Sequence, residues 1–160
     1  MITLTAANPS DTAAIAAVLA RLAKPGDMFV LIGEMGAGKT FFAQQFGAAF
    51  GVTEPITSPT FNLLHNYSGG RLPLHHADLY RLERTGEFAD LGISELTDAG
   101  GLALVEWGDV VDDIISDGLT VALTHVDDND DARTIEIGWR GMQWASRWDS
   151  VKTALARWAS

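Results

Sequence analysis

The chain contains the stretch Gly33-Glu34-Met35-Gly36-Ala37-Gly38-Lys39-Thr40. It matches the pattern G-x-x-x-x-G-K-S/T at every defined position. A continuous apolar run over residues 28–32 precedes it, which is typical of a strand buried on both faces of a parallel sheet. Residues 40–50 follow and predict a helix that ends at Gly51, a common C-terminal cap. A strand, a glycine-rich turn and a helix in this order predict a phosphate-binding loop.

Each residue type in this stretch has a chemical role in binding phosphate. Glycines let consecutive backbone N–H groups point into one concavity that binds anions, and the helix that follows places its positive N-terminal end there. Lys39 is then expected to reach the β- and γ-phosphates, and the Thr40 hydroxyl to ligate Mg²⁺. The residues predicted to hold the nucleotide are Glu34, Met35, Gly36, Ala37, Gly38, Lys39 and Thr40.

Two acidic residues are candidates for a further metal ligand. Glu106 follows the apolar run 102–105, and Asp78 follows residues 74–77. Both therefore fall at the predicted carboxyl ends of strands, the edge at which ligands bind in open α/β sheets. One carboxylate would serve the metal, directly or through water, while the other orients the attacking water. The sequence leaves open which residue does which.

The segment Ser58-Pro59-Thr60 lies between the loop helix and a predicted hairpin. In nucleotide switches, a hydroxyl in such a place senses the γ-phosphate and Mg²⁺. Ser and Pro are also common turn residues, so the spacing alone leaves both interpretations open. The adjacent His75 and His76 invite a metal interpretation, but neighbours on a strand point to opposite faces and would not chelate one ion.

Size and composition indicate one domain over residues 1–160. The chain is 47% hydrophobic and 20% charged, an ordinary globular balance. Its formal charge of −10 argues against direct gripping of a nucleic-acid backbone and against binding to an anionic membrane surface. There are no cysteines, which excludes disulfides and thiolate metal sites. No run approaches the roughly 20 apolar residues of a membrane span, and the N-terminus lacks a signal-peptide pattern, so a cytoplasmic location is expected.

The rest of the chain predicts a mixed α/β arrangement. Asn8 and Pro9 are typical of a helix start, and residues 78–92 are expected to be loop with a short helix. The other predicted elements are a strand over 2–5, hairpins formed by 61–67 with 72–77 and by 119–126 with 134–139, a strand over 102–105, a helix over 108–116 and one closing helix over 142–158. The acidic residues 127–131 are expected to form a solvated turn. The fold class predicted is α/β: a P-loop NTPase-like three-layer domain with a mostly parallel central sheet and antiparallel additions.

Four blocks together resemble a known family. They are Gly33–Thr40, Ser58-Pro59-Thr60-Phe61, His76-Ala77-Asp78-Leu79-Tyr80-Arg81-Leu82 and Leu104-Val105-Glu106-Trp107, in this order. The chain resembles the bacterial TsaE (YjeE) ATPases over about residues 1–140. The resemblance implies ATP and Mg²⁺ as cofactors and slow hydrolysis of ATP, which resets a complex with TsaD and TsaB subunits that modifies tRNA with threonylcarbamoyladenosine. It implies contact with tRNA only through that complex.

The resemblance also implies individual roles. Lys39 and the loop amides would hold phosphates, Thr40 and Glu106 would ligate the metal, and Asp78 would be a catalytic or metal-shell acid. Thr60 would be the switch residue. Thr12 is similar to a family position near the nucleotide base, and Arg133 falls where the family places a basic residue near the nucleotide. Trp107 would lie beside the site, and Arg81 and Arg84 would meet phosphate, an acidic partner or solvent.

Three other functions fit parts of the sequence. A small-molecule P-loop kinase would need a second substrate pocket and a lid with arginines, and Arg81 and Arg84 give only weak support for such a lid. A GTP switch of the Ras-like class would need an Asn-Lys-x-Asp element, and the chain has no Asn-Lys pair. A nucleotide-gated interaction module would bind ATP without useful turnover.

Overall fold

One seven-stranded sheet organises the part of the chain that the computed structural model describes, residues 1–57, 64–79, 92–107 and 117–160. The strand order is β1-β7-β6-β2-β5-β4-β3. The strands are β1 (Ile2–Ala6), β2 (Met28–Ile32), β3 (Leu64–Tyr67), β4 (Leu74–Asp78), β5 (Leu102–Trp107), β6 (Gly118–Val126) and β7 (Asn129–Arg140). The helices are α1 (Pro9–Leu22), α2 (Lys39–Phe50), α4 (Ile93–Asp98), α5 (Met142–Ala145) and α6 (Trp148–Leu155), followed by the short 3₁₀ helix η1 (Ala156–Trp158).

The sheet is parallel in its centre and antiparallel at its edges. Strands β6, β2, β5 and β4 run parallel to one another, whereas β1, β7 and β3 are added in antiparallel pairings. The prediction of a mixed α/β fold with a parallel centre and antiparallel additions is confirmed at this level. The parallel share is smaller than "mostly parallel" implies, because three neighbouring pairs are parallel and three are antiparallel.

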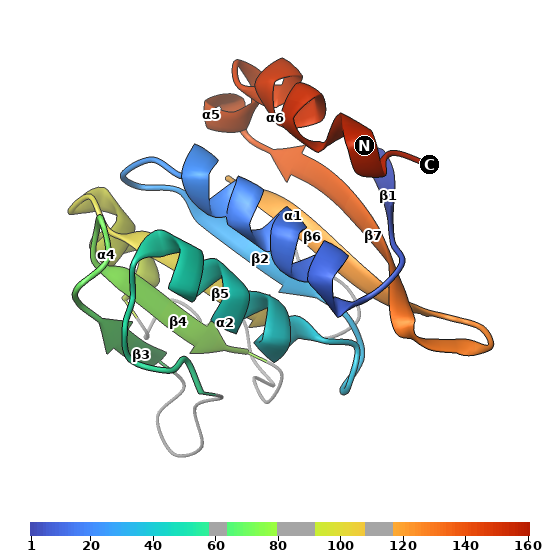
Figure 1. Ribbon diagram of the computed structural model, residues 1–160. Coiled ribbons are helices and arrows are strands. Elements are labelled where there is room, and N and C mark those ends of the chain that lie inside the picture. The colour runs from blue at the N-terminus through green and yellow to red at the C-terminus, as the bar shows by residue number, and fades with distance from the viewer. Residues whose placement is uncertain (58–63, 80–91, 108–116) are drawn as a thin grey trace.

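Most of the core lies between the sheet and the helices on one face. Helices α1 and α2 lie side by side over this face, and α5 and α6 extend the layer toward β7 (Figure 1). Phe29 of β2 has its ring centroid 4.9 Å from that of Phe46 on α2 and 5.4 Å from that of Trp144 on α5. On the opposite face a smaller cluster packs Ile93 of α4 against Val30 and Val105. Helices therefore cover both faces, and the parallel strands are buried as their apolar sequence predicts.

Local signals place most elements correctly. Helix α1 begins as predicted, because the Asn8 side chain accepts a hydrogen bond from the backbone N–H of Asp11 at 2.9 Å. Helix α2 ends at Gly51, whose φ of 99° is left-handed, as expected of a glycine cap. Both hairpins form. The helix expected over 108–116 and most of the loop expected over 78–92 lie outside the described residues.

One sequence prediction at element level is wrong, and one element was not predicted. The single closing helix over 142–158 is instead divided into α5, α6 and η1, with a break at Ser146 and Arg147. The break lets Trp144 enter the core beside Phe29 while Arg147 reaches Asp27, two directions that one straight helix does not serve. Helix α4 was not predicted at residues 93–98, since it is only six residues long and follows Gly92, and the short helix was expected within residues 78–92 instead.

The two ends of the chain meet at the β1 edge of the sheet (Figure 1). The backbone N–H of Ser160 donates to the Thr3 carbonyl oxygen at 2.9 Å, and Leu4 forms an isolated bridge with Ala159. No helix among the described residues has both the length and the apolar character needed to span a bilayer.

Candidate nucleotide-binding site

The glycine-rich loop, residues 33–40, joins the carboxyl end of β2 to the start of α2. Gly38 caps α2 with a φ of 107°, a left-handed conformation that side chains with a Cβ rarely adopt. A Cβ on Gly33 would lie 2.9 Å from the Leu123 carbonyl oxygen and 3.0 Å from the Ala37 Cβ. The loop thus needs glycine at Gly38 for its backbone conformation and at Gly33 for the close approach of the loop to β6.

Lys39 is the first residue of α2 and is only 8% exposed. Its ammonium group donates a hydrogen bond to the carbonyl oxygen of Gly33 at the other end of the loop. The positive charge is therefore held against the loop rather than in solvent, at the N-terminal end of a helix, where backbone amides also favour an anion.

Thr40 joins the loop to the central strand β5. Its hydroxyl donates to Glu106 Oε1 at 3.0 Å, although the two residues are 66 positions apart in sequence. Glu106 is 2% exposed, so its carboxylate faces the loop and not the solvent. A hydroxyl and a carboxylate oxygen are ligands that suit Mg²⁺, which usually takes few protein ligands together with phosphate and water. These two side chains fit a magnesium site.

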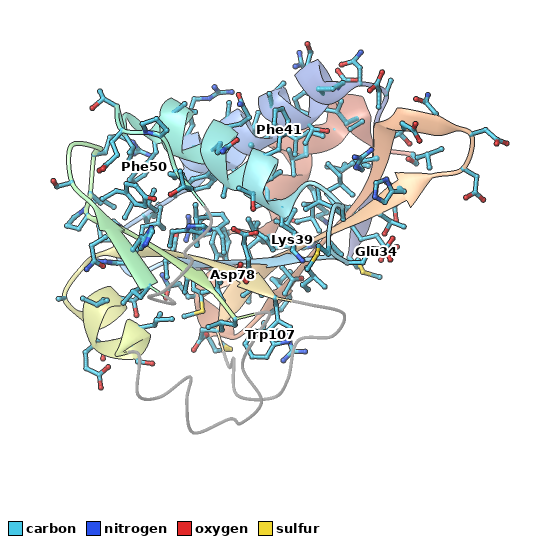
Figure 2. The ribbon with its side chains drawn as sticks, turned by 90° about the horizontal axis from the view of Figure 1, so that it is seen from below. Glu34, Lys39, Phe41, Phe50, Asp78 and Trp107 are labelled. Atoms are coloured by element: carbon cyan, nitrogen blue, oxygen red, sulfur yellow. The ribbon has the colours of Figure 1, made fainter. Side chains whose placement is uncertain are left out.

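Asp78, the other predicted carboxylate, lies beside Glu106. The parallel pairing of β4 with β5 sets Asp78 opposite Glu106, and paired residues on parallel strands project to the same face. Asp78 is partly exposed, and in Figure 2 it lies at the same end of the sheet as Lys39. The direct contact with Thr40 favours Glu106 as the metal ligand and leaves Asp78 as the neighbouring acid.

His76 has a contact that the sequence did not predict. Its Nε2 lies 2.5 Å from Glu106 Oε2, and the His76 ring is fully buried. His75 points the other way, as strand alternation requires: its Nδ1–H donates to Asn66 Oδ1 at 2.7 Å. The side chains of the two histidines therefore lie on opposite faces of β4, as predicted. The contact of His76 with Glu106 depends on the register of β4 against β5 and could not be predicted from the sequence.

Burial lowers the pKa of the His75 imidazole from its ordinary value of 6.5. In the unfolded chain His75 takes up a proton near pH 6.5, whereas in the folded chain it stays neutral to a lower pH. Protonation therefore favours the unfolded state, and the free energy of unfolding is expected to fall as the pH drops below about 6.5. The variant His75→Gln should show a smaller loss of unfolding free energy between neutral and mildly acidic pH, measured by urea denaturation. His125→Gln, at an exposed position, should keep the original pH dependence of stability. If His75→Gln also keeps that pH dependence, His75 is not its source.

Thr12 and Arg133, both expected near the nucleotide, meet beside the loop. They line a pocket of about 170 Å³ together with Ala37 and Gly38. Arg133 Nε donates to the Ala37 carbonyl oxygen at 2.8 Å, which ties β7 to the loop. The pocket lies beside the loop, between α1 and the β6–β7 hairpin.

The same pocket contains residues that the sequence did not single out. Asp130 and Asp131 line it, together with Pro9, Phe41 and Leu123. The acidic run 127–131 was expected to be only a solvated turn, but the turn is confined to Asp127 and Asp128, and β7 already begins at Asn129. Asp130 and Asp131 belong to the strand that carries Arg133, and both line the rim of the pocket while staying exposed to solvent. Periodicity gives no signal for this.

The structure places four of the remaining predicted residues, and three others lie outside the part of the chain that it describes. Glu34, Met35 and Gly36 form the exposed tip of the loop, and Met35 is 75% exposed. Trp107 packs on the smaller core cluster, on the opposite face of β5 from Glu106. Thr60, Arg81 and Arg84 lie outside the described residues, and their predicted roles stay predictions.

Comparison with known proteins agrees with this arrangement. The sequence profile of the family described as "Threonylcarbamoyl adenosine biosynthesis protein TsaE" matches residues 6–135. This chain belongs to the TsaE family. The matched span includes the glycine-rich loop, Asp78, Glu106 and Arg133, and it ends before α5.

Individual TsaE relatives are similar over most of the chain. The Bacillus subtilis protein named "tRNA threonylcarbamoyladenosine biosynthesis protein TsaE" is 44% identical over 106 residues, which is 66% of each chain. The Rickettsia felis protein of the same name is 39% identical over 124 residues, 76% of this chain and 72% of the relative. A crystal structure of YdiB from Bacillus subtilis superposes with a TM-score of 0.72 and 32% identity, covering 98% of this chain and 97% of that one. That superposition extends past the family match into the C-terminal helices.

Proposed function

We propose that this chain is a P-loop protein that binds ATP with Mg²⁺ and hydrolyses it within the system that makes threonylcarbamoyladenosine in tRNA. Family membership supports the biosynthetic system. The observation that carries the ATPase proposal is the hydrogen bond from Thr40 to Glu106. It joins the end of a glycine-rich loop to a carboxylate at a strand end, the pair of oxygen ligands that P-loop enzymes use for Mg²⁺.

The proposed roles follow from position. Lys39 and the loop amides hold the β- and γ-phosphates, and the pocket lined by Thr12 and Arg133 takes the base. Thr40 and Glu106 hold Mg²⁺, which when bound neutralises charge on the phosphate oxygens. Asp78, next to Glu106 and partly exposed, orients the water that attacks the γ-phosphate. Thr60 is proposed as the switch residue that senses the γ-phosphate.

We further propose that activity depends on partners. TsaD-like and TsaB-like subunits would carry out the transfer to tRNA, and ATP turnover by this chain would reset their complex. The formal charge of −10 supports contact with tRNA only through those subunits, because phosphate affinity requires clustered Lys and Arg. Such a role belongs in the cytoplasm.

Two measurements test the proposal. Calorimetric titration with ATP and Mg²⁺ should show saturable binding, and phosphate release should be slow for the chain alone and faster when both partner subunits are added. A parallel arm supplies small-molecule acceptors instead of partners. A phosphorylated acceptor would indicate a kinase, and ATP binding without hydrolysis in the full complex would indicate an interaction module; either result would replace the ATPase assignment.

Thr40→Ala is predicted to reduce turnover mainly when Mg²⁺ is limiting. The substitution removes one metal oxygen but leaves Lys39 and the loop amides, so metal-free ATP binding should remain while hydrolysis at limiting Mg²⁺ falls by roughly tenfold or more. Phosphate release across a Mg²⁺ series measures this. Thr40→Ser keeps the hydroxyl and should behave like the unaltered chain; unchanged hydrolysis of Thr40→Ala at limiting Mg²⁺ would count against the assignment.

A further inference from the structure

We propose that His76 is a positioning residue that fixes the Glu106 carboxylate so that its other oxygen faces Thr40 and the metal. The inference rests on the proposed function, because it concerns the same magnesium site. It adds a member of that site which neither binds phosphate nor ligates the metal itself.

The geometry divides the two oxygens of Glu106 between two neighbours. Oε2 lies 2.5 Å from His76 Nε2, and Oε1 accepts from the Thr40 hydroxyl at 3.0 Å. The terminal torsion of a glutamate is broad, so one hydrogen bond alone would leave the carboxylate free to rotate. A second bond from the neighbouring strand fixes the plane of the carboxylate and leaves only Oε1 on the side of the loop.

Burial makes this second bond important. His76 is 0% and Glu106 2% exposed, and an ionised carboxylate in such a place is unfavourable unless it is hydrogen-bonded. Strand β4 supplies the donor from within the sheet, two residues before Asp78 and on the same face. Without it, Oε2 would have to take the Thr40 hydroxyl or another donor, and the carboxylate would turn away from its metal-binding orientation.

The other nitrogen of the ring shows that His76 is directed at Glu106. Nδ1 is buried and has no hydrogen-bond partner among the described residues. A carboxylate accepts, so in this contact Nε2 is the donor to Glu106 Oε2. Burying an unsatisfied polar atom costs free energy. A residue needed only for packing would be better apolar at this position, and the contact with Glu106 accounts for the imidazole.

Variants of His76 that differ in reach test the proposal. Glutamine can present an N–H at about the reach of Nε2, whereas asparagine is one methylene shorter and leucine has no donor. Mn²⁺ affinity of the nucleotide-bound chain, followed by electron paramagnetic resonance, should fall about 10–100-fold in His76→Asn and His76→Leu. It should stay within about threefold of the original in His76→Gln. ATP affinity without metal should be unchanged in all three variants, because the His76 ring hydrogen-bonds to Glu106 and not to the glycine-rich loop.

The control and the contrary outcomes separate this inference from the proposed function. His75→Gln alters the same strand on the opposite face and should leave Mn²⁺ affinity unchanged. If the unaltered chain binds no ATP, the proposed function fails; if it binds ATP but His76→Asn keeps full Mn²⁺ affinity, the positioning role fails alone. Should the variants not fold, nitrogen NMR of the unaltered chain decides: a proton on Nε2 is expected, and a proton on Nδ1 with Nε2 bare would overturn the proposal.

Discussion

Lys39→Ala is expected to bind ATP roughly 100-fold more weakly than the unaltered chain, a loss of about 2.8 kcal/mol. Hydrogen bonds to charged groups each contribute about 1.5–3 kcal/mol, and Lys39 is proposed to serve both the β- and the γ-phosphate. Its ammonium is already held against the loop by the Gly33 carbonyl. Little side-chain ordering therefore remains when the nucleotide binds, and most of the interaction energy goes into affinity.

Isothermal calorimetry with ATP and Mg²⁺ measures the Lys39 effect directly. Lys24→Ala is the matched control, since it removes the same charge from an exposed position beyond the end of α1. If long-range charge were responsible, both variants would weaken ATP binding alike. Normal ATP binding by Lys39→Ala would contradict the assignment of the loop as the phosphate site.

The loop could be predicted from the sequence because its signals are local. The apolar run, the glycines, the Lys-Thr pair and the terminal glycine of α2 all lie within residues 28–51, and each constrains its own neighbourhood. The hairpins and the capped start of α1 are local in the same way. Strand-end positions also placed Glu106 and Asp78 correctly, since the carboxyl ends of neighbouring parallel strands meet at one edge.

What could not be predicted depends on contacts between distant segments. The hydrogen bond of His76 to Glu106 requires the register of β4 against β5, which no periodicity encodes. Asp130 and Asp131 line the pocket only because β7 starts early and passes the loop. The closing helix breaks at Arg147 because of a partner 120 positions away in sequence, Asp27. In each case the structure depends on contacts between distant segments that the local pattern does not encode.

The net charge of the whole chain and the charges at the loop act on a phosphate over different distances. A chain of formal charge −10 would repel a triphosphate at long range, yet the proposed phosphate site needs only short-range donors. Lys39, Arg133 and the amino end of α2 all lie at the loop. Salt also screens charges farther away than about 8–10 Å, so the local arrangement decides whether a phosphate binds.

Arg147→Ala is expected to destabilise the fold by about 3 kcal/mol, lowering the melting temperature by roughly 6–12 °C. Arg147 Nη1 lies 2.8 and 3.0 Å from the two oxygens of Asp27, whose side chain is fully buried. Its other terminal nitrogen donates to the Leu22 carbonyl oxygen, and its guanidinium stacks 4.0 Å from the Trp144 ring centroid. Removing it leaves a buried carboxylate without its cation and withdraws support from Trp144.

Part of the Arg147 effect is offset by the donors that remain. Asp27 keeps hydrogen bonds from the Lys24 backbone and from Gln143, which places the expected loss at the lower end of the range for broken buried pairs, about 3–5 kcal/mol. Lys152→Ala breaks the exposed pair with Asp149, whose side chains are 45% and 97% exposed, and should change stability by only about 0–0.5 kcal/mol. Urea unfolding compares the two variants. Equal stability losses would mean that burial does not govern the Asp27 pair, and that packing by Trp144, Val151 and Leu155 alone holds the C-terminal helices.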